Sequence, residues 1–105
     1  MNQGTQDVGI SISAAGTTQG TATLLINGIN VLSTVAVNSG AVLFASNLGT
    51  CQFVYNGGAN SVKIYPPLGL QINGLGINNA HNLSPNTSCE YWTVSGTQIV
   101  ALQSA

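Results

Sequence analysis

The sequence predicts an all-β protein, namely a single antiparallel β-sandwich or barrel of the jelly-roll kind with about eight short strands. Short alternating or β-branched runs recur roughly every ten residues, and turns rich in Gly and Asn separate them. No window places apolar residues at the three-and-four spacing of a helix without a Gly or β-branched cluster inside it. At 105 residues the chain is long enough for one domain with one core.

The first half of the chain is expected to form four strands. Residues 8–13 alternate between apolar and polar side chains, as a half-buried strand does, and a polar, Gly-rich stretch follows over 14–20. Asn27-Gly28 separates two apolar runs, and an Asn-Gly pair in that position is the strongest short-range signal for a β-hairpin. The four strands are expected over residues 8–13, 22–26, 29–37 and 41–45.

The second half is expected to add the remaining strands. Residues 56–60 form a turn rich in Gly and Asn, and Pro66-Pro67 ends the next strand because proline cannot donate a hydrogen bond to a sheet. Residues 75–85 are expected to be irregular, and Ser95-Gly96 is expected to join the last two strands. These strands are expected over residues 50–55, 61–65, 88–94 and 97–102, with a further short strand over 68–72.

The chain shows no domain boundary and no exact internal repeat. The polar residues 1–7 are expected to form a flexible N-terminal arm, and residues 8–105 to form one β-domain. The arm has neither the positive start nor the apolar stretch of a signal peptide, and no apolar run approaches the roughly 20 residues of a membrane span. We therefore expect synthesis in a cytoplasm and no association with a membrane.

Charge is the most unusual property of the composition. Only Asp7, Lys63 and Glu90 carry a full charge at neutral pH, which is 3% of the chain, whereas an ordinary soluble domain has roughly a quarter of its residues charged. An uncharged polar surface can lie against other proteins without the desolvation of ions. This favours a subunit of a larger assembly. A single basic residue argues against nucleic-acid binding, which needs several Lys or Arg.

The titratable residues do not form a pattern that predicts an enzyme, a metal site or a cofactor site. Cys89 and His81 are the best candidates for a catalytic dyad, but Glu90 would raise the thiol pKa and no helix is expected to lower it. His81 and the two cysteines supply only three soft ligands at irregular spacing. Residues 74–79 begin like a dinucleotide-binding fingerprint but lack its third glycine. We expect no catalytic, metal or cofactor residue.

Two pairs of residues leave alternatives open. Cys51 and Cys89 are either small buried side chains or a disulfide, and a reducing cytoplasm favours the first. Lys63 and Glu90 either face each other across strands or a subunit boundary, or are two separate solvated side chains.

The most aromatic face is expected from five residues that all lie in the second half of the chain: Phe53, Tyr55, Tyr65, Tyr91 and Trp92. Strand alternation places Phe53 and Tyr55 on the same side as Cys51. It places Trp92 with Glu90, and Tyr91 with Cys89 on the opposite side. A contact between the two cysteines requires that their strands are neighbours.

Residues 56–75 resemble a segment of small virion proteins of tailed bacteriophages. In those proteins a strand of the form GAN-x-hydrophobic-x-hydrophobic-YP leads into G-x-QIN-G-L, and here GANSVKIYP leads into GLQINGL. The closing run over 91–102 and the early residues 14–19, followed by 22–25, are also similar. The resemblance implies a capsid cement or decoration protein, usually a β-rich trimer on the head surface, or less directly a fibre or spike component. It implies no catalytic residue.

From these observations we expect a homotrimer that binds the major capsid protein on the virion surface, assembles in the host cytoplasm and needs no cofactor. The alternative is a glycan-binding module of a phage fibre or spike. In that case Trp92 or Tyr91, beside Asn78 and Asn79, would form the sugar site, because such sites combine exposed aromatic rings with amide side chains.

Overall fold

Two β-sheets that share one core make up the protein. The computed structural model describes residues 7–104, and these contain ten strands and no helix. One sheet has six strands in the order β1-β3-β5-β9-β10-β7, and the other has four in the order β2-β4-β6-β8. The strands are β1 (Val8–Ala14), β2 (Thr23–Leu24), β3 (Ile29–Val35), β4 (Gly40–Val42), β5 (Cys51–Asn56), β6 (Val62–Tyr65), β7 (Gln71–Ile72), β8 (His81–Leu83), β9 (Ser88–Thr93) and β10 (Gln98–Gln103).

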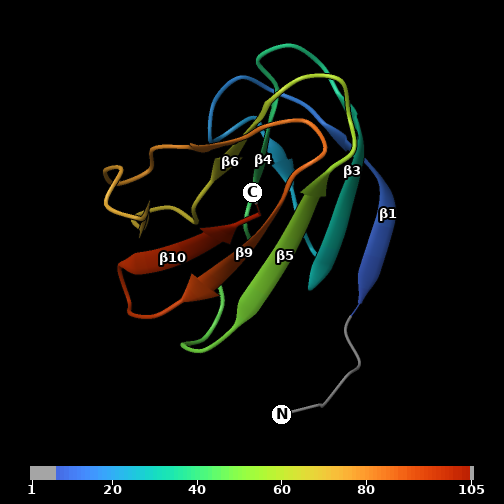
Figure 1. The fold of residues 1–105 in the computed structure, drawn as a ribbon. Helices are drawn as coiled ribbons and strands as arrows, with labels where there is room; N and C mark the ends of the chain where they lie inside the picture. The colour runs from blue at the N-terminus through green and yellow to red at the C-terminus, as the bar shows by residue number, and fades with distance from the viewer. Residues whose placement is uncertain (1–6, 105) are drawn as a thin grey trace.

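The path of the chain through these sheets is that of a β-solenoid. The first six strands alternate between the two sheets, so that β1, β3 and β5 lie side by side in one sheet and β2, β4 and β6 in the other (Figure 1). Within each set of three strands, all pairings are parallel. Each coil therefore contributes one strand to each sheet and stacks on the coil before it.

The strand pairings define a loose internal repeat. In the six-stranded sheet Val8 lies opposite Ile29, and Ile29 lies opposite Phe53, so equivalent positions are 21 and then 24 residues apart. In the four-stranded sheet Ala41 lies between Thr23 and Ile64, at offsets of 18 and 23 residues. The unequal lengths of the turns explain why the sequence shows no exact repeat.

The last part of the chain closes one end of the solenoid with antiparallel strands. β9 pairs antiparallel with β5, β10 pairs antiparallel with β9, and β8 pairs antiparallel with β6. β7 then joins the edge of the six-stranded sheet by a parallel pairing with β10. The two sheets are therefore mixed.

The prediction of an antiparallel sandwich or barrel is wrong. The Asn27-Gly28 pair does not close a hairpin, because it joins β2 of one sheet to β3 of the other. The turn over 56–60 likewise carries the chain from β5 in the six-stranded sheet to β6 in the four-stranded one. These turns are corners of a coil, where the chain changes sheet. Only the Ser95-Gly96 turn joins antiparallel neighbours, β9 and β10, as expected.

The positions of the individual strands agree better with the sequence. β6 ends at Tyr65, directly before Pro66-Pro67, as predicted. The strand expected over 68–72 is shortened to β7. Residues 75–85, expected to be irregular, contain the short strand β8. Of the expected arm over 1–7, residues 1–6 lie outside the described part of the chain, and the Asp7 carbonyl accepts a hydrogen bond from the Ile29 N–H at 2.9 Å.

The core lies between the two sheets and combines aliphatic side chains with a few amides. Leu32, Val54 and Tyr91 face inward from the six-stranded sheet, and Ile64 and Leu83 face them from the other. Their burial supplies the main driving force for folding.

Asn56 is also fully buried, at the corner after β5. Its amide N–H₂ donates to the carbonyls of Asn60 and Leu83, each at 2.9 Å, and its oxygen accepts from Gly58 N–H at 2.9 Å. With these three hydrogen bonds, the buried Asn56 amide holds the corner after β5.

Stacked coils approach each other closely at Gly58. A Cβ on Gly58 would lie 2.7 Å from the Val35 Cβ and 2.8 Å from the Val35 backbone nitrogen. Only glycine allows the corner after β5 to pack on the preceding coil at this distance.

Within residues 7–104 there is no helix of the length and apolar character needed to cross a bilayer.

Candidate functional site

The outward side of the six-stranded sheet carries a row of half-buried and exposed apolar side chains. β5 and β9 are antiparallel neighbours, and Phe53 lies directly opposite Glu90 while Cys51 lies opposite Trp92. Strand alternation turns these four side chains away from the core, and Ile29 joins them from β3 opposite Phe53. We call this surface the outer face, and its members are Val8, Ile29, Val31, Cys51, Phe53, Tyr55, Ser88, Glu90, Trp92, Val100 and Leu102.

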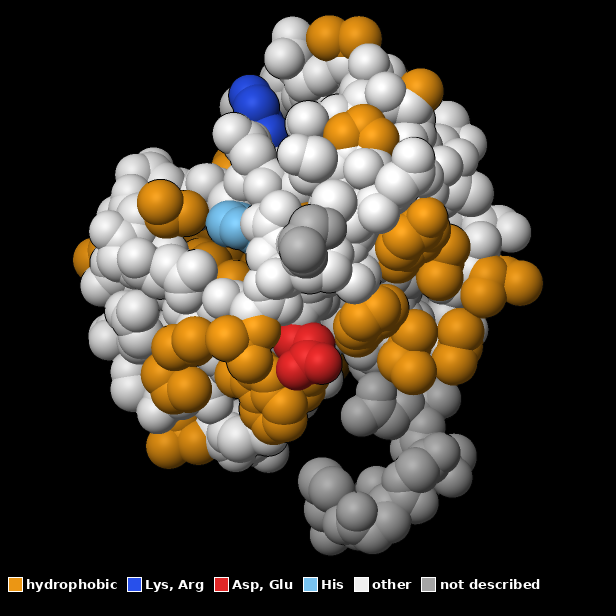
Figure 2. Space-filling view, in the orientation of Figure 1, with side chains coloured by type: hydrophobic (Ala, Val, Ile, Leu, Met, Phe, Trp, Pro, Cys, Tyr) orange, Lys and Arg blue, Asp and Glu red, His pale blue; other side chains and the backbone are white. Residues whose placement is uncertain are grey.

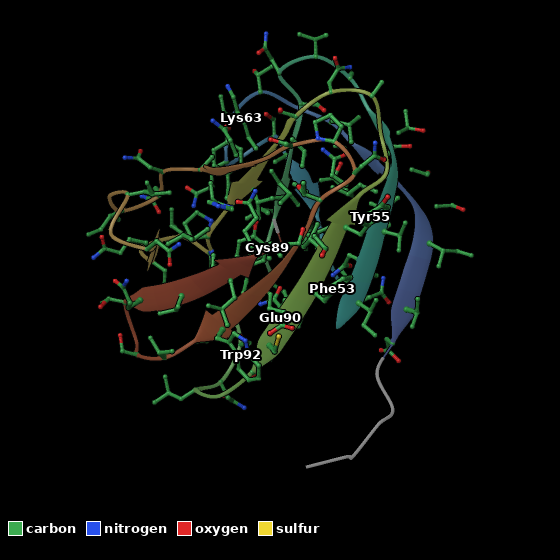
Figure 3. All side chains as sticks on the ribbon, viewed as in Figure 1. Phe53, Tyr55, Lys63, Cys89, Glu90 and Trp92 are labelled. Atoms are coloured by element: carbon green, nitrogen blue, oxygen red, sulfur yellow. The ribbon has the colours of Figure 1, made fainter. Side chains whose placement is uncertain are left out.

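A shallow hollow of about 380 Å³ opens on the outer face and is lined by Ile29, Cys51, Phe53, Glu90 and Trp92. Figure 2 shows an acidic side chain with hydrophobic side chains on two sides of it, and Figure 3 places Glu90 between Phe53 and Trp92. Trp92 is 37% exposed, so its ring takes part in the surface. One carboxylate, two aromatic rings and an aliphatic wall therefore share one hollow.

Glu90 is oriented by its neighbour on the same strand. The Trp92 indole N–H donates to the Glu90 carboxylate at 3.1 Å, across the two-residue spacing that puts both side chains on one side of β9. This hydrogen bond leaves the second carboxylate oxygen free to accept from another group.

Lys63 does not neutralise this carboxylate. Lys63 lies on β6 in the four-stranded sheet, whereas Glu90 lies on β9 in the six-stranded sheet, and the two labels stand far apart in Figure 3. The hypothesis that the two residues face each other across strands of one chain is therefore wrong.

The two cysteines lie on opposite sides of the six-stranded sheet and are free thiols. Their strands are neighbours, as a contact would require, but Cys51 faces the hollow and Cys89 faces the core. The preference for buried thiols over a disulfide is confirmed fully for Cys89 and in part for Cys51, which is half-buried.

Both thiols have raised pKa values. Burial, with a smaller contribution from Glu90, raises the pKa of Cys51, and burial raises the pKa of Cys89 to about 11. Both are therefore protonated at neutral pH, which is the opposite of an activated nucleophile.

His81 pairs with Tyr91 and not with Cys89. Its Nδ1 lies 2.9 Å from the Tyr91 hydroxyl, and the two rings pack edge to face with centroids 5.6 Å apart. Burial lowers the pKa of His81 and raises that of Tyr91. Within residues 7–104 no three His, Cys, Asp or Glu side chains come together as metal ligands would.

The aromatic residues divide between the outer face and the interior. Phe53, Tyr55 and Trp92 share the outer face. The predicted alternation is confirmed: Phe53 and Tyr55 lie on the same side of β5 as Cys51, and on β9 Trp92 lies with Glu90 while Tyr91 lies with Cys89 on the opposite side. Tyr91 is fully buried, and Tyr65 is buried on β6, where its hydroxyl donates to the Thr17 carbonyl at 3.1 Å.

The side chains of Asn78 and Asn79 are engaged in hydrogen bonds within the described chain. The Asn78 oxygen accepts from the Gly69 N–H at 2.7 Å and from the Gln19 amide at 3.2 Å, and the Asn79 amide donates to the Leu75 carbonyl at 3.0 Å. Together with the burial of Tyr91, this separates the residues that the sequence suggested for a sugar site. Of the two aromatic members, Trp92 is exposed and Tyr91 is buried.

The sequence did not indicate Ile29 and Cys51 as site residues. Ile29 reaches the hollow because parallel stacking puts it beside Phe53, 24 residues later in the chain. The signal that could have found it is the loose repeat of about two dozen residues, since equivalent positions of successive coils stack in one row.

Comparisons with known proteins give no relative: no family model, no curated protein and no solved structure matches this chain.

Proposed function

We propose that this chain is a cement or decoration protein of a tailed-bacteriophage head, which assembles as a homotrimer and bridges subunits of the major capsid protein. The proposal places the chain on the virion surface after assembly in the host cytoplasm. It assigns the chain no chemical step, no cofactor and no binding to nucleic acid or membrane.

The outer face is the observation that carries this proposal. It is broad and largely apolar, it contains one charged side chain, and it belongs to a two-sheet solenoid. Large apolar surfaces with aromatic residues at their centre are typical of protein interfaces. The resemblance of residues 56–75 to phage virion proteins supports the same assignment.

The proposed interface also has few ions to desolvate. The whole chain has one Lys or Arg and two acidic residues. Attachment to the capsid should therefore depend only weakly on salt, because screening acts on charges. A protein that leaves its capsid in moderate salt would contradict the proposal.

The experiment has two steps. Light scattering after size-exclusion chromatography gives the mass in solution, and a trimer is expected. The protein is then mixed with heads assembled from the major capsid protein of the same genome and sedimented. Co-sedimentation supports the proposal, and a chain that stays in the supernatant at all ratios overturns it.

Cys51 provides a test of which surface is covered. Cys89 is 1% exposed, so a maleimide that reacts with the native protein reports on Cys51 in the hollow. We expect slower alkylation on the capsid than in solution. An equal rate on sedimented heads would place the capsid contact elsewhere on the molecule.

One observation favours the alternative of a glycan-binding module. The exposed Trp92 ring beside the Glu90 carboxylate is also an arrangement that stacks on a sugar and accepts its hydroxyl hydrogens. A saturable shift of Trp92 fluorescence during a titration with neutral sugars would favour this alternative over the cement protein.

A further inference from the structure

Within residues 7–104, the charge in the hollow has no cationic side chain among the residues that line it. Glu90 is the carboxylate that lines the hollow, and the one Lys or Arg of the chain, Lys63, lies in the other sheet. When an interface covers the outer face, Glu90 loses water, and an unpaired carboxylate in such a place is strongly unfavourable. A cation on the partner would compensate this charge.

The shape and composition of the hollow select the kind of cation. Phe53 lies directly opposite Glu90, and Trp92 lies diagonally from Phe53 across the two strands. A planar guanidinium stacks on an aromatic ring and at the same time donates to a carboxylate, whereas an ammonium is compact and strongly hydrated. The Trp92 N–H already fixes one oxygen of the carboxylate, so the acceptor is oriented before the partner arrives.

We propose that the hollow is a receptor for an arginine side chain of the partner protein, with the guanidinium stacked on Phe53 or Trp92 and hydrogen-bonded to Glu90. This inference rests on the proposed function, because it names the group of the capsid surface that the outer face recognises. The arginine must come from a different protein, since the one basic residue that the chain contains is a lysine. It would be the specificity-determining contact in an otherwise apolar interface.

The probe is Nα-acetyl-argininamide, followed by the fluorescence of Trp92, which is the one tryptophan of the chain. We expect a saturable change with a dissociation constant of about millimolar, as for a single side chain in an open site. The matched ligand is Nα-acetyl-citrullinamide, which has nearly the same shape without the charge. It should bind about tenfold more weakly or not at all.

The diagnostic variant is Glu90→Gln. Its side-chain oxygen can still accept from the Trp92 indole, so the substitution removes the charge and keeps that hydrogen bond. It should weaken argininamide binding about tenfold or more. Lys63→Gln is the control, because it changes the net charge by one unit outside the hollow, and it should leave the titration unchanged.

The outcomes separate this inference from the proposed function. Equal binding of citrullinamide, or an unchanged titration of Glu90→Gln, overturns the arginine receptor even if the wild-type protein sediments with heads. Argininamide binding that depends on Glu90 supports the receptor even if the heads are not bound. A fluorescence response to neutral sugars alone overturns it in favour of a glycan site.

Discussion

Gln52 holds the backbone of Phe44 with both ends of its amide. The Gln52 N–H₂ donates to the Phe44 carbonyl at 2.9 Å, and its oxygen accepts from the Phe44 N–H at 3.1 Å. Gln52 is fully buried on β5, and Phe44 lies just after β4, so the two hydrogen bonds tie the strand of one sheet to the segment that leaves the other. The amide replaces the partner strand that the Phe44 backbone lacks at this point.

The first prediction concerns this contact. Gln52→Leu conserves the approximate volume of the side chain but leaves the Phe44 N–H and C=O without these partners. We expect the free energy of unfolding to fall by about 2–3 kcal/mol, measured by urea denaturation. Gln98→Leu, at a half-exposed position of β10, is the matched control and should stay within about 0.5 kcal/mol of the wild type. Equal stability of the two variants would contradict the assigned role of Gln52.

The second prediction tests the stacking of the coils. Gly58→Ala would introduce a methyl group 2.7–2.8 Å from atoms of Val35, so one coil must move relative to the next. We expect a loss of about 1–3 kcal/mol in the free energy of unfolding.

Gly20→Ala is the control for this substitution. A Cβ on Gly20 meets no atom within 4 Å, and the change should be neutral or slightly stabilising. If both variants unfold at the same denaturant concentration, the result contradicts the close contact between Gly58 and Val35 of the preceding coil.

The sequence predicts the strands well and their partners poorly. Alternation depends on neighbouring residues only. One segment of sequence is therefore enough to predict that Phe53 and Tyr55 face one side of their strand and that Gln52 and Val54 face the other. The same alternation fits a parallel and an antiparallel neighbour equally well. An Asn-Gly turn fixes a change of direction, but whether the chain returns in the same sheet or enters the other depends on distant packing.

The uncharged polar composition has two explanations that the sequence alone cannot separate. Asn38, Asn73, Asn78 and Asn86 adopt positive φ values between 51° and 66°, a conformation that asparagine tolerates better than most residues. Part of the Asn content therefore serves the turns between strands. The scarcity of Lys, Arg, Asp and Glu needs a further reason, and the interface proposed for the outer face offers one.

The candidate site could be predicted only in part for the same reason. Phe53 and Trp92 belong to the aromatic residues that the sequence singles out, and Glu90 to its few charges. Their meeting in one hollow depends on the pairing of β5 with β9, and Ile29 depends on the parallel pairing with β3. Neither pairing follows from local pattern.

The third prediction concerns the pH dependence of stability. The sequence contains one histidine, His81, and burial lowers its pKa below the usual 6.5 in the folded state. At pH well above 6.5 the residue is neutral in both states and adds no pH dependence. As the pH falls below that value, the unfolded chain takes up a proton that the folded protein resists, so the free energy of unfolding decreases.

The measurement is a series of urea denaturations between pH 7.5 and pH 5. His81→Gln removes the titrating ring, and its amide can still hydrogen-bond the Tyr91 hydroxyl that lies 2.9 Å from Nδ1 in the wild type. The variant should lose part of the decline in stability that the wild type shows between pH 6.5 and pH 5. Parallel pH profiles for the two proteins would contradict this prediction. They would mean that His81 has the same pKa in the folded protein as in the unfolded chain.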